Sequence, residues 1–329
     1  MLRMAIGRHS PRVIGAIALL LAATAAWSVR ALEVQVLRSI DGMAPEVLGL
    51  FREPAACQTL VDGSYLVFDR AGHRVCRVPP SGSEAVELVR IGPEAGNIIG
   101  PSAFALAGDR FIVADAPRQR ERVQLFGFDG GLLSSFSLSG RATARITQGR
   151  LTFNGVSSLR WAGRSIVMSQ PETGGVMIEF TPRGHPVRTI GQFRATGHED
   201  DRDLHLALNS GLPLFRKYDD DDRLLFARHI QGPELGATIQ TLPTAWPRRT
   251  DGLGRDLPLA PPTVRTAEVD PAGNLWVSLW LPFTYVYDSH GDKIRTVQFR
   301  DAGLLSPDRL FFESRDRPLV TPGCYRFSV

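Results

Sequence analysis

The chain has 329 residues, of which 43% are apolar and 22% charged, a composition typical of a folded globular protein rather than a disordered or collagen-like one. Its formal net charge of +4 comes entirely from the first 31 residues, which carry four arginines and no acidic residue. Removing these four from the 38 basic residues leaves 34 basic and 34 acidic residues in 32–329. That neutral balance argues against a basic nucleic-acid-binding surface, so no nucleic-acid partner is expected.

The first thirty residues have the pattern of a secretory signal peptide. Arg3, Arg8 and Arg12 form a positive n-region, and an apolar run of 17 residues follows over 13–29. Val29-Arg30-Ala31 then supplies small residues at the −3 and −1 positions of a cleavage site. An uncleaved membrane anchor is the alternative, but the run is at the lower length limit for spanning a bilayer. We therefore expect a signal peptide over 1–31 and a mature, periplasmic or secreted chain over 32–329, with no stable membrane insertion after cleavage.

One phrase of about forty residues recurs along the mature chain. It consists of four short apolar or β-rich segments joined by turns rich in Gly, Asp and Pro, which is typical of β-strands and hairpins. Its clearest copies cover 57–91, 102–138, 156–190 and 264–299. Four short strands at this period are the signature of β-propeller blades. A β-sandwich is the alternative, but it does not explain why a four-strand phrase repeats.

The two ends of the mature chain fit together as one blade. Residues 310–328 provide only three strands, whereas 33–40 form a lone alternating strand before the first full copy. We expect this N-terminal strand to pair with the strand at 324–327 and close the ring, which removes the open sheet edges.

Residues 192–261 break the pattern, being too many for one blade and too few for two. We expect an inner strand at 204–208, an outer hairpin of 214–218 and 224–227, and then a Pro-rich insertion over 233–261 with a short helix in its first part. The count is six blades with an irregular fourth blade, which reflects either a true deletion or a sequence error.

The segment Val113-Ala-Asp115, continued by Arg122-Val-Gln-Leu-Phe126 and Asp129-Gly130, resembles the NHL repeat. Residues 33–329 as a whole are similar to secreted bacterial six-bladed β-propellers of the NHL-repeat/TolB-like type without assigned activity. The resemblance implies an all-β propeller fold. It does not select a function, because propellers host lyases, lactonases, sensors and binding modules.

Lactonase-type propellers hold a divalent cation at the channel mouth with Glu, Asn and Asp oxygens, so Asn154, Asn209, Glu268 and Asp270 are the residues to consider. Their spacing does not single them out, and turn Asn and Asp residues are usually structural. The acidic run 219–222 lies where a solvated hairpin turn is expected. We therefore expect no metal site and no cofactor.

The three cysteines, Cys57, Cys76 and Cys324, are an odd number for an oxidising compartment. Cys57 and Cys76 fall on the first and third strands of one blade, about 9–10 Å apart, whereas a disulfide needs Cα atoms within about 7 Å. We therefore expect all three to be buried free thiols.

The function expected from the sequence is non-catalytic binding of a protein or small ligand, because no nucleophile elbow, P-loop or HExxH motif occurs. The alternative is a lactonase-like, metal-dependent hydrolase or lyase with its site at the central channel. In either case we expect the ligand at the channel mouth, where inner strands converge. The polar residues expected to line it are Ser102, Ser157, His205 and Thr266.

Overall fold

The computed structural model describes most of the chain from residue 34 to its end. The described residues are 34–82, 84–142, 144–147, 150–153, 156, 159–169, 175–192, 214–219, 223–239, 248–250, 256–258, 264–301, 304 and 306–329. The expected signal peptide, 1–31, lies outside this set. No helix within these ranges is long and apolar enough to cross a membrane.

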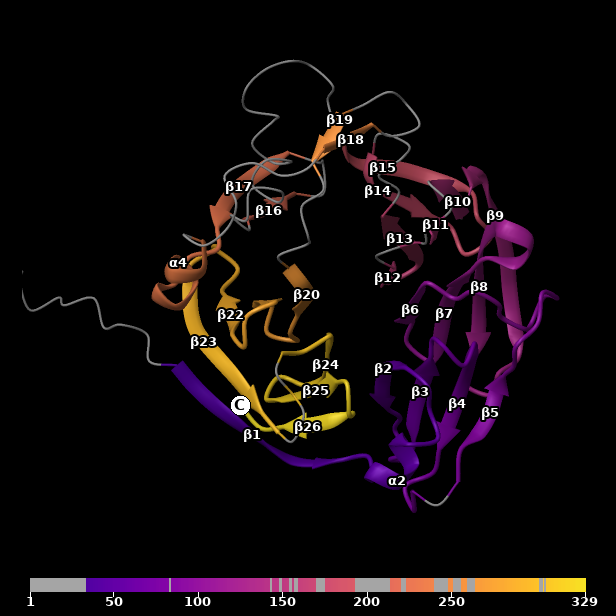
Figure 1. Ribbon diagram of the computed structural model, residues 1–329, viewed down its shortest axis with the longest axis horizontal. Helices are drawn as coiled ribbons and strands as arrows, with labels where there is room; N and C mark the ends of the chain where they lie inside the picture. Colours follow the sequence, from indigo (N-terminus) through magenta and orange to yellow (C-terminus); the bar gives the residue numbers. More distant parts are fainter. Residues whose placement is uncertain are drawn as a thin grey trace, which may run out of the picture.

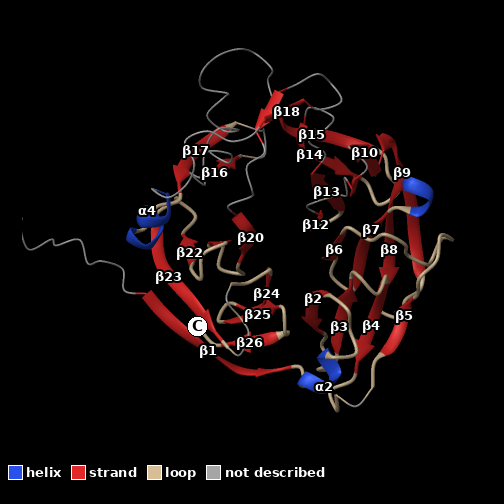
Figure 2. Ribbon diagram, in the orientation of Figure 1, coloured by secondary structure: helices blue, strands red, loops and turns tan. Residues whose placement is uncertain are grey.

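Almost all elements of the described chain are β-strands (Figure 2). Their sheets are arranged around a central axis (Figure 1), so the fold is a β-propeller. Three sheets each contain four strands that are consecutive in the sequence. The first sheet is β2 (Pro54–Thr59), β3 (Tyr65–Asp69), β4 (Arg74–Val78) and β5 (Val86–Val89). The second is β6 (Ala103–Leu106), β7 (Arg110–Asp115), β8 (Arg120–Gly127) and β9 (Leu132–Ala142). The third is β12 (Leu159–Ala162), β13 (Ser165–Ser169), β14 (Gly175–Phe180) and β15 (Pro186–Gln192).

The remaining large sheet has eight strands in the order β20-β21-β22-β23-β1-β26-β25-β24. One half is β20 (Val264–Val269), β21 (Leu275–Leu279), β22 (Thr284–Tyr287) and β23 (Lys293–Arg300). The other half is β1 (Val34–Gly42), β24 (Arg309–Ser314), β25 (Arg317–Thr321) and β26 (Tyr325–Phe327). Each half is one blade, so the four copies of the repeat expected from the sequence and the composite last blade are confirmed.

Strand β1 closes the ring and also joins two blades. Its second part, from Ser39 to Gly42, runs antiparallel to β26, as the sequence predicts. Its first part, Val34 to Arg38, runs parallel to β23. The second pairing was not predicted. It merges the last two blades into one sheet and leaves neither β23 nor β26 as a free edge.

The irregular part of the chain contains short elements. The hairpin of β16 (Leu214–Tyr218) and β17 (Leu224–His229) confirms the predicted outer hairpin, and α4 (Pro233–Ile239) confirms the short helix. The expected inner strand at 204–208 lies outside the described residues. The other short elements are α2 (Pro45–Leu48), η1 (Pro117–Gln119), the hairpin β10 (Ala144–Thr147) and β11 (Arg150–Phe153), and the hairpin β18 (Arg248–Thr250) and β19 (Asp256–Pro258).

Adjacent blades pack through aromatic side chains. Phe68 on β3 of the first blade stacks on Phe104 of the second with ring centroids 5.3 Å apart. Phe111 and Phe126 continue the stack within the second blade, at 5.8 and 5.2 Å. All four rings are buried. Such rings bury a large apolar area at each contact, which stabilises the blade interface.

The Asp and Arg of the NHL-like segment hold the loop that enters the blade. The Asp115 carboxylate accepts hydrogen bonds from Arg122, at 2.6 and 2.9 Å, and from the backbone N–H of Ile99 just before β6. In the first blade Asp69 likewise accepts from Arg74 and from the N–H of Glu53 just before β2. These motif residues are therefore structural.

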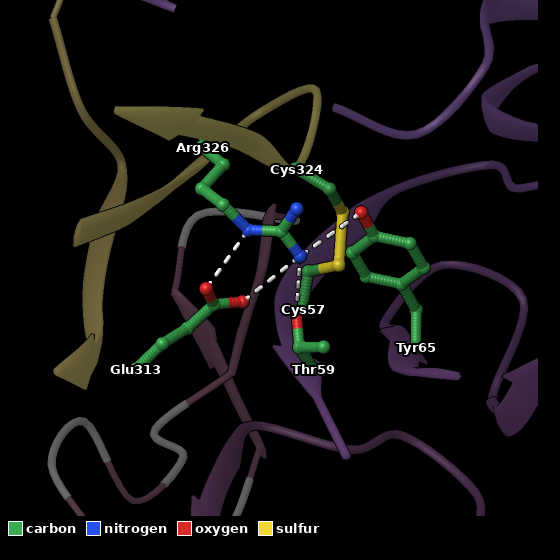
Figure 3. Close-up of a disulfide and its surroundings, with 6 residues drawn as sticks. All are labelled: Cys57, Thr59, Tyr65, Glu313, Cys324 and Arg326. Atoms are coloured by element: carbon green, nitrogen blue, oxygen red, sulfur yellow. Dashed lines mark hydrogen bonds and ion pairs between the residues drawn. A yellow bond between two sulfur atoms is a disulfide. The ribbon is translucent and has the colours of Figure 1, made fainter. Parts of the chain in front are cut away.

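The first and last blades are joined covalently, which corrects the expectation of three reduced cysteines. Cys57 on β2 and Cys324, just before β26, form a disulfide with a Cα–Cα distance of 5.7 Å (Figure 3). Cys76 is a buried free thiol, so the expectation is met there, and the predicted absence of a Cys57–Cys76 bridge is confirmed. The distance between Cys57 and Cys76 within one blade does not bear on Cys324, which ring closure brings from the last blade against the first.

Arg326 reinforces the same junction from β26 (Figure 3). Its guanidinium pairs with Glu313 at 2.8 and 3.2 Å and with Asp41 of β1 at 2.6 Å. It also donates to Thr59 Oγ1 and the Tyr65 hydroxyl of the first blade, at 3.1 and 3.4 Å. One side chain thus connects both blades and the N-terminal strand.

Candidate functional site

A cavity of about 520 Å³ lies where the innermost strands of four blades converge. Strands β2, β12, β20 and β24 contribute to its wall, and each is the first strand of its blade and faces the axis (Figure 1). The lining residues are Glu53, Pro54, Ala55, Arg70, Arg160, Val264, Arg265, Thr266, Ala267, Asp308, Arg309 and Pro322. The fold thus surrounds one volume with residues up to 269 positions apart, counting from Glu53 to Pro322.

The cavity wall is rich in charged groups, most of which are paired. Arg70, in the turn after β3, forms an ion pair with Glu53. Arg265 lies 3.3 Å from an Asp308 carboxylate oxygen. These pairs neutralise two of the four arginines that line the cavity.

Arg160 of β12 forms the third pair, across the axis to the blade of β20. It lies 2.5 Å from Glu268 and also donates to the backbone carbonyl of Ala267 at 3.0 Å. Burial raises the pKa of Glu268 above its usual value, although the Arg160 charge and hydrogen bond act in the opposite direction. Glu268, which is not among the lining residues, is therefore the ion-pair partner of Arg160.

Arg309, the first residue of β24, is the fourth arginine. No hydrogen bond or ion pair to its guanidinium occurs within the described residues, and its nitrogens are not sealed from solvent. Burial, followed by repulsion from Arg160 and Arg70, lowers the pKa of Arg309 from its usual value. Among the described residues, Arg309 is therefore the lining arginine without a carboxylate ion-pair partner.

The four residues predicted to line the channel fall in different places. Thr266 of β20 does line the cavity. Ser102 is not among the described lining residues; it lies just before β6, where its hydroxyl is 3.5 Å from the Ala114 carbonyl oxygen. Ser157 and His205 lie outside the described residues, so their placement stays a prediction.

The lactonase-like metal ligands considered from the sequence are not gathered into a site by the described residues. Asp270 accepts four hydrogen bonds of 2.9 Å, two from backbone N–H groups and two from the side chains of Asn274 and Trp276. Its carboxylate closes a turn, and Glu268 is paired with Arg160. Asn154 and Asn209 lie outside the described residues. No group of three or more His, Cys, Asp or Glu suited to a metal ion occurs in the described ranges.

The acidic run expected as a solvated turn is described only at its first residue. Asp219 accepts from the backbone and side chain of Arg223, at 2.8 and 2.9 Å. Residues 220–222 lie outside the described ranges.

Sequence reasoning missed the arginines of the cavity. Only two of the 38 basic residues are Lys, so a single arginine does not stand out in this sequence. A local signal was nevertheless present, because Arg160, Arg265 and Arg309 all lie at the first strand of a repeat copy. Polar residues at that position deserve inspection in any propeller sequence, since the innermost strands face the axis.

No family model matches the sequence, and no curated protein matches it either. Solved structures with a similar fold include a streptogramin B lyase, 10% identical, covering 82% of this chain and 76% of that one with a TM-score of 0.44. A catalytically inactive virginiamycin B lyase from Staphylococcus aureus with quinupristin is 11% identical, covering 82% and 78%, with a TM-score of 0.41. A gluconolactonase from Xanthomonas campestris is 15% identical, covering 91% and 98%, with a TM-score of 0.45. At these identities and TM-scores, the activities of those proteins do not transfer to this chain.

Proposed function

We propose that this protein is an extracytoplasmic, six-bladed β-propeller of the NHL-repeat/TolB-like type that binds a small ligand in its axial cavity without transforming it. The observation that carries the proposal is the convergence of four innermost strands on one cavity of about 520 Å³. That volume is within the range of about 300–1,000 Å³ typical of small-molecule sites.

The count of six rests on five four-stranded units and one partial unit. The β16–β17 hairpin lies between β15 and β20 in the ring, in the position of the outer half of a further blade (Figure 1). Residues 204–208 would supply its inner strand.

The extracytoplasmic location rests on two features. Residues 1–31 have the order of a signal peptide, positive, then apolar, then small residues. The Cys57–Cys324 disulfide supports an oxidising compartment, because the cytosol keeps most structural thiols reduced. N-terminal sequencing of the exported protein should give Leu32 as its first residue; retention of 1–31 would contradict cleavage.

Binding is favoured over the lactonase-like alternative by the state of the carboxylates. Asp270 uses its oxygens on four donors of its own turn, and Glu268 faces Arg160. Displacing Asp270 onto a cation would leave the buried indole N–H of Trp276 unpaired, which is costly. Displacing Glu268 would break its ion pair with Arg160.

The experiment is a thermal-shift screen of a small-molecule library against the wild type and a variant with a blocked cavity. Ala267→Trp places an indole in the lining, whereas the matched Ala272→Trp lies in an exposed turn of the same blade. Ligands that stabilise the wild type and Ala272→Trp should lose their effect on Ala267→Trp. Hits that stabilise Ala267→Trp equally, or no cavity-dependent hit at all, would refute the proposal.

A further inference from the structure

The ligand class can be derived from the charges of the axial cavity. Four arginines line it, from the turn after β3 and from β12, β20 and β24. Three of them each have one carboxylate partner, namely Glu53, Glu268 and Asp308. The cavity therefore carries one positive charge more than the described acidic residues neutralise, and that charge lies on Arg309.

Arg309 is in an unfavourable environment for an unpaired cation. A partly buried guanidinium has lost some of its hydration, and such groups are normally compensated by an acidic partner. Arg160 and Arg70 are close enough to repel it. Glu268 and Asp308 attract it, but each is already paired, with Arg160 and Arg265, and the net pKa of Arg309 is lowered. An anion in the cavity would relieve this repulsion.

The position of Arg309 is also fixed. Its backbone lies in the ladder between β24 and β25, opposite Thr321, and the N–H of the preceding Asp308 donates to the Thr321 carbonyl at 2.8 Å. The side chain of Arg309 extends from this fixed backbone and lines the cavity, and its guanidinium carries a planar set of N–H donors. Two of these parallel N–H donors can bind two oxygens of one carboxylate or phosphate in a bidentate pair.

We infer that the axial cavity binds a small ligand through an oxyanion group, a carboxylate or a phosphate, which pairs with Arg309 as its anchor. The inference rests on the proposed cavity-binding function and specifies its ligand. Arg160, Arg70 and Thr266 line the same cavity, where the two arginines keep their own carboxylate partners.

The test compares Arg309→Gln with Arg315→Gln. Both variants lose one positive charge from the same blade, but Arg315 lies in the exposed turn at the other end of β24, about 20 Å away along the strand. The probes are citrate, glucuronate, inorganic phosphate and glucose 6-phosphate, with neutral glucose as the reference. Calorimetric titration and thermal shift are measured at constant ionic strength set with sodium chloride, because screening alone changes surface electrostatics.

At least one acidic probe should bind the wild type and Arg315→Gln alike, and bind Arg309→Gln about tenfold or more weakly. The carboxylate and phosphate arms identify which oxyanion is preferred. In buffer without multivalent anions, Arg309→Gln should also unfold at a temperature equal to or above that of the wild type, because it removes repulsion rather than a salt bridge.

Equal binding of the acidic probes to Arg309→Gln and the wild type would overturn the inference, as would the absence of binding by all four acidic probes. A large loss of stability in Arg309→Gln would assign the residue a structural role instead. These failures are distinct from failure of the proposed function, which Ala267→Trp tests independently: a neutral ligand lost from Ala267→Trp but retained by Arg309→Gln would leave cavity binding intact.

Discussion

Removing the disulfide between the first and last blades should weaken the whole propeller. Cys57 and Cys324 are 267 residues apart in sequence, so the bond closes nearly the entire ring into one covalent loop. The chain-entropy relation for a loop of that length gives about 5.6 kcal/mol of stabilisation at 25 °C, and native disulfides typically contribute about 2–5 kcal/mol. We therefore expect the double variant Cys57→Ala, Cys324→Ala to lose about 2–5 kcal/mol of unfolding free energy. For a chain of this size that corresponds to roughly 4–10 °C in Tm.

The assay is urea unfolding followed by tryptophan fluorescence, with and without a phosphine reductant. The reductant should destabilise the wild type and leave the double variant unchanged, because the variant has no bond to break. Alkylation of the denatured, unreduced wild type should add one label, on Cys76, by intact mass. Three labels, or a wild type whose stability does not respond to reduction, would refute the reasoning.

Three further predictions concern the closure, a turn and the free thiol. Deleting 34–42 removes the strand that pairs with both β23 and β26, so amide hydrogen exchange should accelerate in both strands. The control, a chain starting at residue 34, should keep the protection of both strands. Unchanged exchange in the deletion variant would argue against closure by β1. Asp270→Asn should lower the unfolding free energy by about 1–3 kcal/mol at pH 7. Burial raises the pKa of Asp270, but the hydrogen bonds from Trp276 and Asn274 outweigh burial, and the net pKa lies below 3.8. Because the folded pKa is depressed, this contribution is present above the unfolded pKa and is lost as the pH falls through the folded pKa. The stabilities of wild type and variant in urea titrations should therefore converge as the pH is lowered below 3.8, whereas a constant difference would contradict the assignment. Burial raises the pKa of Cys76 to about 11, so iodoacetamide at pH 8 should label it only after unfolding, and rapid labelling of the folded protein would show that the site is open.

Much of the fold is determined by local sequence. Hairpins depend on short-range signals, and strands such as Tyr65–Asp69, Arg74–Val78 and Val264–Val269 lie inside the predicted repeat copies because short β-rich segments there are separated by turn residues. The repetition of that unit is itself visible in the sequence, so the propeller and its closure by the N-terminal strand followed from the pattern. A spare strand at one end and a missing strand at the other are also features of the linear chain.

The cavity and the closure contacts were decided by tertiary structure. Arg160, Arg265 and Arg309 come from three blades, and no local pattern states which of them keeps a carboxylate partner, because the partners depend on blade rotation and strand register. The pairing of Cys57 with Cys324 and the parallel contact of β1 with β23 likewise join segments more than 250 residues apart. Short-range turn chemistry and periodicity act within a blade, whereas the charge balance on the axis arises only when the ring brings the blades together.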